Sequence, residues 1–387
     1  MSAATSAIFL PDHSQLTIVS PAPIPRGTIF ITHSDPRAGT VYAKWTVRLT
    51  NPTNIAPTTQ SDRIAIVDAF TCTGQPHPDA VFLLYATLTW YFHLKPPVQN
   101  DLRPGAPCSD WRVTLERVGA FAHEDALAAA EQAGIVFLLR HPTEDIYYAH
   151  CMRRTFWQLS YPYIKMPSPC LYLITGNGVR APLRPRPARD LYRRHIPALN
   201  AVLTFRLATL DDVPLLNKWM NQPRVSAFWG EEGPLEKTEQ FLRKNLGYDH
   251  SFPVIGSWEE VVVRDGRVME SGVAEPFGYF EIYWAKEDRL GQYAKADDWE
   301  RGLHVLIGEE KFRGSHRVKG WLGGLIHYCF CDDPRTMTVS LEPRVDNERF
   351  IRYLMEEGFS KEREISFPHK QSALMRLTRE AWPGCAV

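Results

Sequence analysis

The 387-residue chain has no surplus of either charge, because 44 Lys and Arg residues balance 44 Asp and Glu residues. A protein that coats nucleic acid needs a basic surplus to meet the phosphates, so the composition argues against nucleic acid as a partner. The chain also lacks the low hydrophobicity of a disordered protein, since AVILMFWYC residues make up 44% and aromatic residues 12%. Its length is sufficient for two or three globular domains.

Cysteine is present in an odd number, seven, and the residues are scattered from Cys72 to Cys385. A disulfide framework is typical of an even number of cysteines in a short secreted chain. The one close pair, Cys329 and Cys331, has no second pair at the spacing of zinc ligands. We therefore predict reduced thiols and no metal site.

Targeting signals and membrane spans are also missing from the sequence. The N-terminus has no basic stretch followed by the apolar run of a signal peptide. The most apolar segment, Ala80–Leu94, is shorter than the roughly 20 residues that cross a bilayer. The tail, Gly384–Val387, is not a peroxisomal tripeptide. These features predict a cytoplasmic protein with no membrane partner.

Composition divides the chain at residues 181–200, which contain four prolines, several arginines and no periodic apolar pattern. We interpret this segment as a linker between an N-terminal domain, residues 1–180, and a C-terminal domain, residues 201–387. No catalytic constellation is recognisable in the N-terminal domain. Its clearest predicted elements are one half-buried strand and two helices: Val41–Thr50, Asp79–Leu94 and Glu124–Ala133.

The C-terminal domain alternates strands and helices in the order β-α-α-β-β-β-α-β-α-β, which predicts a mixed sheet with helices on both faces. Asp265-Gly266 is a hairpin signal between two short predicted strands and indicates a surface insertion. The later elements are two strands and two helices: Leu303–Gly308, Thr338–Leu341, residues 317–328 and Asn347–Glu357. The predicted fold class is mixed α/β in both domains.

The most informative stretch runs from Leu303 to Arg317, where a buried strand enters a short loop that contains Arg313 and Gly314 and opens a helix. Such a loop directs backbone N–H groups at one point, and the helix N-terminus adds partial positive charge. A pyrophosphate group would fit there. An ordinary strand–helix turn with a solvated basic surface explains the same residues equally well.

This stretch resembles the CoA pyrophosphate loop of GNAT-type N-acyltransferases. Three strings are similar, more narrowly, to the hydroxyornithine acyltransferases of fungal siderophore biosynthesis and to bacterial hydroxylysine acetyltransferases: HVLIGEEKFRGSHRVKGWL, SLEPRVDNERF and FPHKQSALM. The strings WMNQPRVSAFW, GYFEIYWAKEDRLG and DDPRT also match, and the resemblance extends from about His195 to Leu377. His316 and Val318 stand where the general GNAT loop has glycines, a substitution that is usual in the siderophore subfamily.

The resemblance implies a GNAT fold in the C-terminal domain and a degenerate, structural GNAT-like copy in the N-terminal domain. It also implies that the hydroxylamino nitrogen of N5-hydroxy-L-ornithine attacks the thioester carbonyl of an acyl-CoA, which forms a hydroxamate. Acyl-CoA would be a co-substrate, with no tightly bound cofactor. The alternatives are N6-hydroxylysine or another amine as acceptor, and a non-catalytic acyl-CoA-binding scaffold. A homo-oligomer formed through the N-terminal domain is compatible with all of these.

A neutral imidazole held by a carboxylate suits the base that takes the proton from the attacking nitrogen. His304 is the candidate base, and the resemblance makes Asp346 the residue that orients it. The alternatives are a satisfied core histidine for His304 and a plain helix N-cap for Asp346.

The resemblance assigns two further groups of residues. The CoA group consists of Leu306, Ile307, Arg313, Gly314, Ser315, Arg317, Val318 and Lys319. The amino acid pocket consists of Arg224, Trp229, His250, Glu281, Tyr283 and Trp284. An ornithine-like substrate requires one acid and one arginine in such a pocket. Tyr283 and Trp284 point to opposite faces of a strand, so at most one of them lines it directly.

Overall fold

The computed structural model describes twelve stretches of the chain: residues 3–21, 27–50, 64–73, 80–93, 112–115, 124–140, 147–159, 161–163, 171–175, 178–184, 187–264 and 267–385. The chain divides into two compact units. The N-terminal unit consists chiefly of residues 1–163, and the C-terminal unit consists of residues 164–262 and 270–386. The predicted turn Asp265-Gly266 lies outside the described residues.

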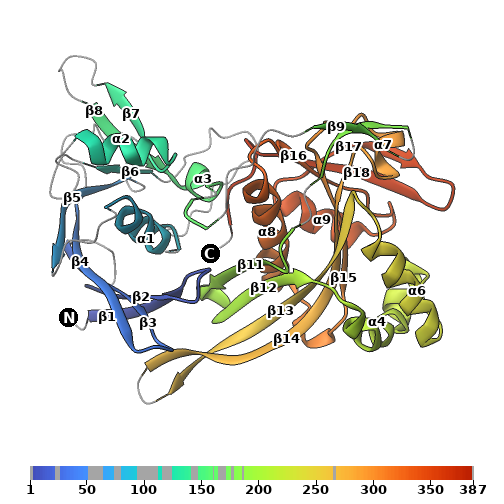
Figure 1. Ribbon diagram of the computed structural model, residues 1–387, viewed down its shortest axis with the longest axis horizontal. Helices are drawn as coiled ribbons and strands as arrows, with labels where there is room; N and C mark the ends of the chain where they lie inside the picture. Colours follow the sequence, from blue (N-terminus) through green and yellow to red (C-terminus); the bar gives the residue numbers. More distant parts are fainter. Residues whose placement is uncertain are drawn as a thin grey trace. The chain divides into compact units, whose positions relative to one another are not determined.

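The C-terminal unit is built on an eight-stranded sheet with the strand order β11-β12-β13-β14-β15-β16-β18-β17 (Figure 1). Its strands are β11 (Asp190–Ile196), β12 (Ala201–Leu207), β13 (Ser251–Arg264), β14 (Arg267–Trp284), β15 (Arg301–Ile307), β16 (Thr338–Leu341), β17 (Ser360–Ser366) and β18 (Gln371–Thr378). The pair β15–β16 is parallel, whereas β14–β15 and β16–β18 are antiparallel. The sheet is therefore mixed, as predicted.

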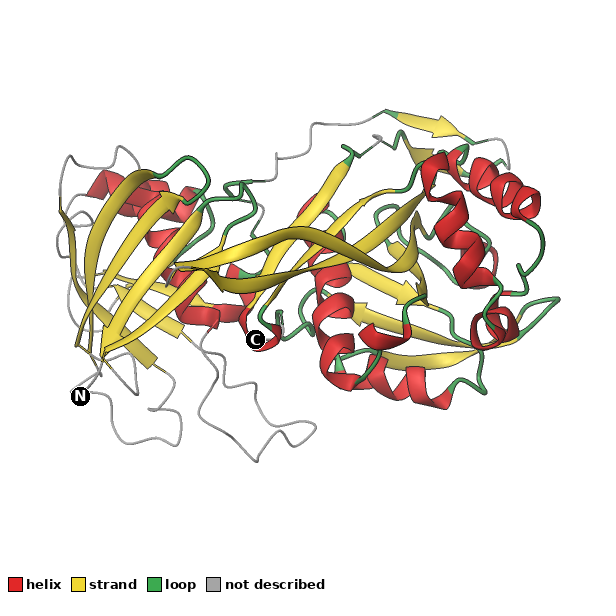
Figure 2. Ribbon diagram, turned by 90° about the horizontal axis from the view of Figure 1, so that it is seen from below, coloured by secondary structure: helices red, strands yellow, loops and turns green. Residues whose placement is uncertain are grey.

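Helices flank this sheet on both faces (Figure 2). They are α4 (Val213–Met220), α5 (Pro223–Trp229), α6 (Leu235–Leu246), α7 (Leu290–Tyr293), α8 (Ser315–Asp332) and α9 (Glu348–Glu356). Alternation along β14 explains the two faces, because successive side chains of a strand point in opposite directions. Phe280 stacks on Trp321 of α8 with 5.8 Å between ring centroids, whereas Tyr279 packs with α4 and α6.

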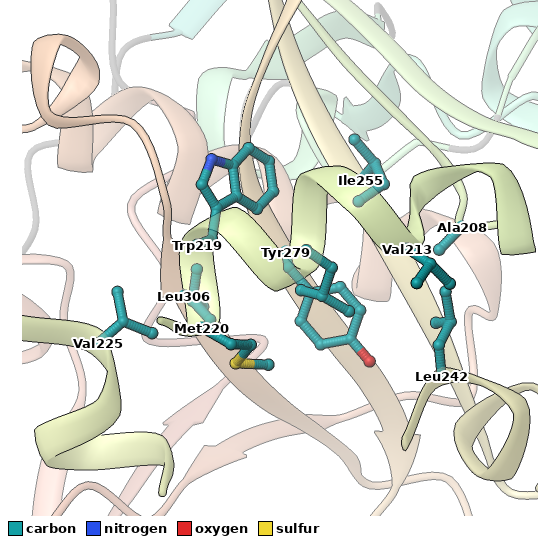
Figure 3. Packing of buried hydrophobic residues seen from close by; sticks show 10 residues of the cluster. Ala208, Val213, Trp219, Met220, Val225, Leu242, Ile255, Tyr279 and Leu306 are labelled. Carbon is teal, nitrogen blue, oxygen red and sulfur yellow. The ribbon is translucent and has the colours of Figure 1, made fainter. Parts of the chain in front are cut away.

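The core beneath α4 is an apolar cluster that includes Trp219, Met220, Ile255, Tyr279 and Leu306 (Figure 3). Trp219 and Tyr279 are fully buried, and such large aromatic side chains contribute most to the packing of a core. The Trp219 indole nitrogen donates a 2.9 Å hydrogen bond to a carboxylate oxygen of Glu309, just beyond β15. The cluster thereby fixes α4 against the strands that carry the candidate site.

The N-terminal unit contains another eight-stranded sheet, with the order β1-β2-β3-β4-β5-β6-β8-β7. Its strands are β1 (Ala3–Phe9), β2 (Gln15–Pro21), β3 (Gly27–Asp35), β4 (Thr40–Thr50), β5 (Ile64–Thr73), β6 (Arg112–Leu115), β7 (Phe137–Arg140) and β8 (Tyr147–Met152). The pair β5–β6 is parallel, and α1 (Ala80–His93) lies between these strands in sequence. A second helix, α2 (Glu124–Gln132), follows β6, and α3 (Arg153–Phe156) follows β8.

The two sheets have the same strand order, and the parallel pair with its long intervening helix occupies the same place in both. This correspondence supports the interpretation of the N-terminal unit as a GNAT-like copy. One difference is clear from chain length. Residues 208–250 connect β12 to β13 and form α4–α6, whereas only residues 22–26 connect β2 to β3.

Residues 181–200, predicted to be a linker, contain regular structure instead. Strand β10 (Arg180–Pro182) pairs with β9 (Tyr172–Ile174), and β11 is an edge strand of the large sheet. The arginine-rich sequence concealed β11 because its charges are buried with partners, as in the ion pair of Arg193 with Glu270. Tyr192 also stacks on Phe205 of β12, with 5.4 Å between ring centroids.

Two other expectations need correction. The short strand after Asp265-Gly266 and the strand at Gly278–Ala285 are one continuous strand, β14, so the hairpin extends the sheet itself. Strand β17 was absent from the predicted order because it is an exposed edge strand without apolar alternation. Within the described stretches, no helix is both long and apolar enough to cross a membrane.

Candidate active site

The registers of three neighbouring strands place two carboxylates beside His304. Glu281 on β14 is the direct antiparallel partner of His304 on β15. The parallel ladder between β15 and β16 pairs Arg301 with Val339 and Gly302 with Ser340. Two residues further along each strand, the same offset brings His304 opposite Glu342. The ladder has already ended there, so the site lies where β15 and β16 separate.

Both ring nitrogens of His304 form hydrogen bonds with these carboxylates. Nδ1 lies 2.8 Å from Oε2 of Glu281, and Nε2 lies 2.8 Å from Oε1 of Glu342. Glu281 and Glu342 are buried, whereas 33% of the His304 side chain is exposed. His304 is therefore the most exposed member of the cluster, and all three side chains line one cavity.

Two tyrosines hold the carboxylates in place. The Tyr279 hydroxyl donates to Glu281 at 2.9 Å, and the Tyr283 hydroxyl donates to Glu342 at 2.7 Å. Tyr283 crosses over β15 at Gly302, where a Cβ atom would lie 1.9 Å from its ring. Only glycine leaves room for that crossing, which links β14 to the end of β16.

The two carboxylates fix the charge of the cluster. Burial alone would lower the pKa of His304, but the charge of Glu342 and the hydrogen bonds from both carboxylates raise it well above the ordinary 6.5. Burial would likewise raise the pKa of Glu342, but the charge and hydrogen bond of His304 lower it to about 2. At neutral pH His304 is therefore an imidazolium ion. This arrangement favours a charged imidazolium over the neutral imidazole base predicted from the sequence, and the catalytic role of His304 stays a prediction.

His304 faces a cavity of about 1070 Å³, large enough for a cofactor-sized molecule together with a second substrate. The start of α8, including Gly314 and Val318, lines the cavity, and so do the loop before α7 and residues that follow β17. The chain leaves β15 toward α8 after Ile307 and leaves β14 toward α7 after Trp284, at opposite ends of the antiparallel β14–β15 ladder. His304 and Glu281 are paired between these two ends.

The loop before α8 has the geometry of an anion site. Gly314 has φ +125°, a conformation that other residues rarely adopt, and it directly precedes the 18-residue helix α8. The first turn of α8 has no acidic residue to neutralise its partial positive charge. Arg313 lines the cavity and forms a 2.8 Å ion pair with Glu310. Its side chain remains partly exposed.

The structure brings most of the residues singled out from the sequence to this cavity: Arg224, Trp229, His250, Glu281, His304, Leu306, Ile307, Arg313, Gly314 and Val318. Glu281, predicted to bind the amino acid, instead binds His304. Arg224 donates to the carbonyl oxygen of Ile307 at 2.6 Å and pairs with Glu310 at 2.9 Å, so its guanidinium is already engaged within the protein.

The other predicted residues do not line the cavity. Tyr283 is buried and acts through Glu342, whereas Trp284 packs against the guanidinium of Arg301 at 3.9 Å. Arg317 packs over Phe312 at 5.0 Å, on a different side of α8 from Val318. Ser315 is the first residue of α8. Lys319 acts electrostatically on Glu357, a buried residue whose pKa burial raises to about 7.

Asp346 is not the partner of His304 in this structure. It is exposed and pairs with Arg344 at 2.5 Å, and both nitrogens of His304 are occupied by other carboxylates. Asn347 is the N-cap of α9, because its side chain accepts from the Phe350 amide, so the helix-cap alternative for Asp346 also fails. A catalytic role of Asp346 by another route stays a prediction.

The sequence did not single out Glu342, although it stands in the string SLEPRVDNERF. A signal was available in principle, since parallel neighbouring strands bring residues at the same offset together. That signal required the register of β15 against β16, which sequence periodicity does not provide. Within the described stretches, no group of three or more His, Cys, Asp or Glu side chains is arranged so that it could hold a metal ion.

Comparisons with known proteins agree with this geometry. Residues 208–367 match the Acetyltransferase (GNAT) domain family. The chain is 38% identical to an N5-hydroxyornithine acetylase of Beauveria bassiana, over 70% of this chain and 53% of that protein. It is 36% identical to an N(6)-hydroxylysine O-acetyltransferase of Escherichia coli, over 59% of this chain and 69% of that protein.

A third relative is an N(5)-hydroxyornithine:cis-anhydromevalonyl coenzyme A-N(5)-transacylase, also of Beauveria bassiana. It is 41% identical over 51% of this chain and 41% of its own length. The chain thus spans about half the length of the two fungal relatives.

Proposed function

Because the chain belongs to the GNAT family of acyltransferases, we propose that it transfers an acyl group from acyl-CoA to the hydroxylamino nitrogen of N5-hydroxy-L-ornithine. The products are free CoA and a hydroxamate, which is a building block for a siderophore. The observation that carries this proposal is the Glu281–His304–Glu342 cluster, which lies in one cavity with the loop before α8.

The loop and α8 support the binding of acyl-CoA. The pyrophosphate meets the amides at the start of α8, with Gly314 and Arg313 beside it. Leu306 and Ile307, at the end of β15, face the same cavity and offer backbone groups to the pantetheine arm. Arg317 and Lys319 lie outside the cavity and are not part of this proposal.

The proton balance of the reaction suits the charged cluster. The hydroxylamino nitrogen is neutral at pH 7, attacks the thioester carbon, and becomes acidic as the C–N bond forms. A carboxylate beside His304 takes that proton, and the His304 imidazolium gives its own proton to sulfur as the C–S bond breaks. The first proton then passes along a 2.8 Å hydrogen bond and restores the imidazolium. Glu281 and Glu342 thus maintain the charge that the departing thiolate requires.

The direct test uses the purified full-length chain with acetyl-CoA and N5-hydroxyornithine. We expect release of free thiol that depends on hydroxyornithine, and a hydroxamate detected by mass spectrometry. Ornithine is the matched control, because its side-chain amine is protonated at neutral pH and cannot attack. A panel of acyl-CoAs, including anhydromevalonyl-CoA, would identify the preferred acyl group. Acyl-CoA binding without turnover of any hydroxylamine would contradict the proposal and favour a binding scaffold.

The second candidate acceptor is N6-hydroxylysine, and the similarity to the Escherichia coli relative favours including it. It differs from hydroxyornithine by one methylene, so both acceptors share the same reacting group and the same amino acid head. The ratio of their kcat/KM values in one assay decides between them. A single methylene typically changes kcat/KM by about 10- to 200-fold in a fitted pocket.

A further inference from the structure

We propose that Asp288 and Arg289 bind the two charges of the acceptor's amino acid head, with Asp288 on the α-ammonium and Arg289 on the α-carboxylate. This inference rests on the proposed function and assigns its acceptor site. Neither residue was among those expected from the sequence. Both line the cavity at the end away from the start of α8.

Comparison of the ion-pair partners of the Lys and Arg residues that line the cavity identifies Arg289 as the candidate for the α-carboxylate. Arg224 and Arg313 pair with Glu310, Arg344 pairs with Asp346, and Lys370 lies 3.6 Å from Glu342. Among the described residues, the cavity-lining cations that face no carboxylate are Arg289 and Arg349. Arg349 belongs to α9 and donates to the Tyr353 hydroxyl of the same helix at 3.0 Å, and its neighbour Phe350 stacks on Trp321 of α8. Arg289 is the cation left for a carboxylate at the acceptor end.

The same comparison of the Asp and Glu residues that line the cavity identifies Asp288 as the candidate for the α-ammonium. Glu281 and Glu342 hold His304, Glu287 pairs with Arg184 at 2.6 Å, and Glu231 pairs with Lys237 at 3.5 Å. Asp288 has no Lys or Arg partner in the part of the chain that the structure describes. One of its oxygens accepts from the Leu290 amide at 3.2 Å, and the other lies 3.4 Å from His250, at the long limit of a hydrogen bond.

The segment that carries both residues is held rigidly. Arg184 binds Glu287 through two hydrogen bonds of 2.8 and 2.6 Å, and both side chains are almost completely buried. Lys286 pairs with Asp298. Lys286 and Glu287 are thus fixed before the pair, and Leu290 is buried directly after it. Asp288 and Arg289 therefore meet a ligand with little loss of backbone freedom.

The position of the pair relative to His304 suits a short amino acid side chain. Leu290, which follows the pair directly, packs in one apolar cluster with Tyr283, and the Tyr283 hydroxyl donates to Glu342. Arg289 lies 3.4 Å from His369, and the next residue along the chain, Lys370, lies 3.6 Å from Glu342. The two charges are thus neighbours of the cluster, so a head group bound there would direct its side-chain nitrogen toward His304.

The test uses two acceptor analogues, each lacking one charge. N-hydroxy-1,4-diaminobutane lacks the α-carboxylate, and 5-(hydroxyamino)pentanoate lacks the α-ammonium. We expect the wild-type enzyme to prefer hydroxyornithine over each analogue by about 10- to 100-fold in kcat/KM, the usual effect of losing a charged hydrogen bond. Arg289→Gln should abolish the preference over the first analogue only, and Asp288→Asn should abolish the preference over the second only.

Matched controls separate this effect from a general loss of charge. Asp211→Asn and Arg243→Gln change exposed residues outside the cavity and should keep both preferences. Arg289→Lys should restore part of the preference that Arg289→Gln loses. In all variants the KM for acyl-CoA should stay within about twofold of the wild-type value.

The outcomes separate the two proposals. If the wild-type enzyme uses hydroxyornithine and both variants keep both preferences, the assignment of Asp288 and Arg289 is wrong. The assignment is also wrong if the KM for acyl-CoA rises while the KM for hydroxyornithine does not, because the pair would then lie at the CoA end. Absence of turnover with every hydroxylamine in the wild-type enzyme would instead overturn the proposed function.

Discussion

At the scale of single residues, the arrangement around His304 determines what kind of proton transfer is possible. A histidine with one carboxylate can alternate between base and acid, but His304 has a carboxylate on each ring nitrogen. Its positive charge is therefore part of the resting site. The same arrangement explains why two tyrosine hydroxyls are needed, since each buried carboxylate requires further hydrogen bonds.

The pH dependence of kcat follows from that charge. Because the pKa of His304 is raised, the imidazolium persists above pH 6.5 and is lost only as the pH passes the raised value. We expect kcat for hydroxyornithine to show no rise through about pH 6.5 and to fall only as the pH passes the raised pKa of His304. A neutral imidazole base would give the opposite profile, a rise through about pH 6.5. Initial rates at saturating substrates distinguish the two.

Substitution of the carboxylates tests which of them acts on His304. Glu281→Gln and Glu342→Gln should each lower kcat by about 10- to 100-fold, because each removes a charge that keeps His304 protonated. Asp346→Asn should change kcat by less than about twofold, because Asp346 is exposed and pairs with Arg344. A large loss of kcat in Asp346→Asn, with small losses of kcat in the two glutamine variants, would show that Asp346 is the carboxylate that acts with His304. Circular dichroism provides the control for folding.

At the scale of elements, the loop before α8 combines a left-handed glycine, a helix N-terminus and an arginine. Arg313→Glu should therefore raise the KM for acyl-CoA by about 10-fold or more, since it places an anion against the pyrophosphate. The KM for hydroxyornithine should change far less. Arg243→Gln on the exposed surface of α6 is the matched control. Equal changes in both KM values would place the pyrophosphate elsewhere.

Much of this element-level structure was predictable from local patterns, and the exceptions share a cause. The apolar run before His93 and the strand–loop–helix around Gly314 are local signals, and both elements were confirmed. The partners of His304 were not predictable, because they depend on register between strands that are distant in sequence. Strand β11 was not predicted for a related reason. Its residue Arg193 is buried in an ion pair with Glu270, and the sequence does not reveal a contact between residues so far apart along the chain.

At the scale of the whole molecule, the edge of the large sheet predicts where the C-terminal unit can be cut. A fragment of residues 201–387 lacks β11 and therefore exposes the edge of β12. It also loses Tyr192, which stacks on Phe205 and forms a 2.8 Å hydrogen bond with His327 through its hydroxyl. We expect it to aggregate or to melt at a lower temperature than a fragment of residues 164–387. Size-exclusion chromatography and thermal denaturation compare the two. Equal behaviour would mean that β11 is dispensable.

The shared strand order of the two sheets has a consequence for how the chain tolerates mutation. In the C-terminal unit, the segment from β15 to α8 combines core packing, the proposed acyl-CoA site and the charged cluster, so few substitutions can satisfy all three. In the N-terminal unit the corresponding helix, α1, is almost wholly apolar, and Thr87 bonds back to its own helix at the Leu83 carbonyl. Packing is the constraint that remains there. In a library of random variants under iron limitation, conservative apolar exchanges should therefore survive in α1 far more often than in α8, although both helices stand at the same place in the same topology.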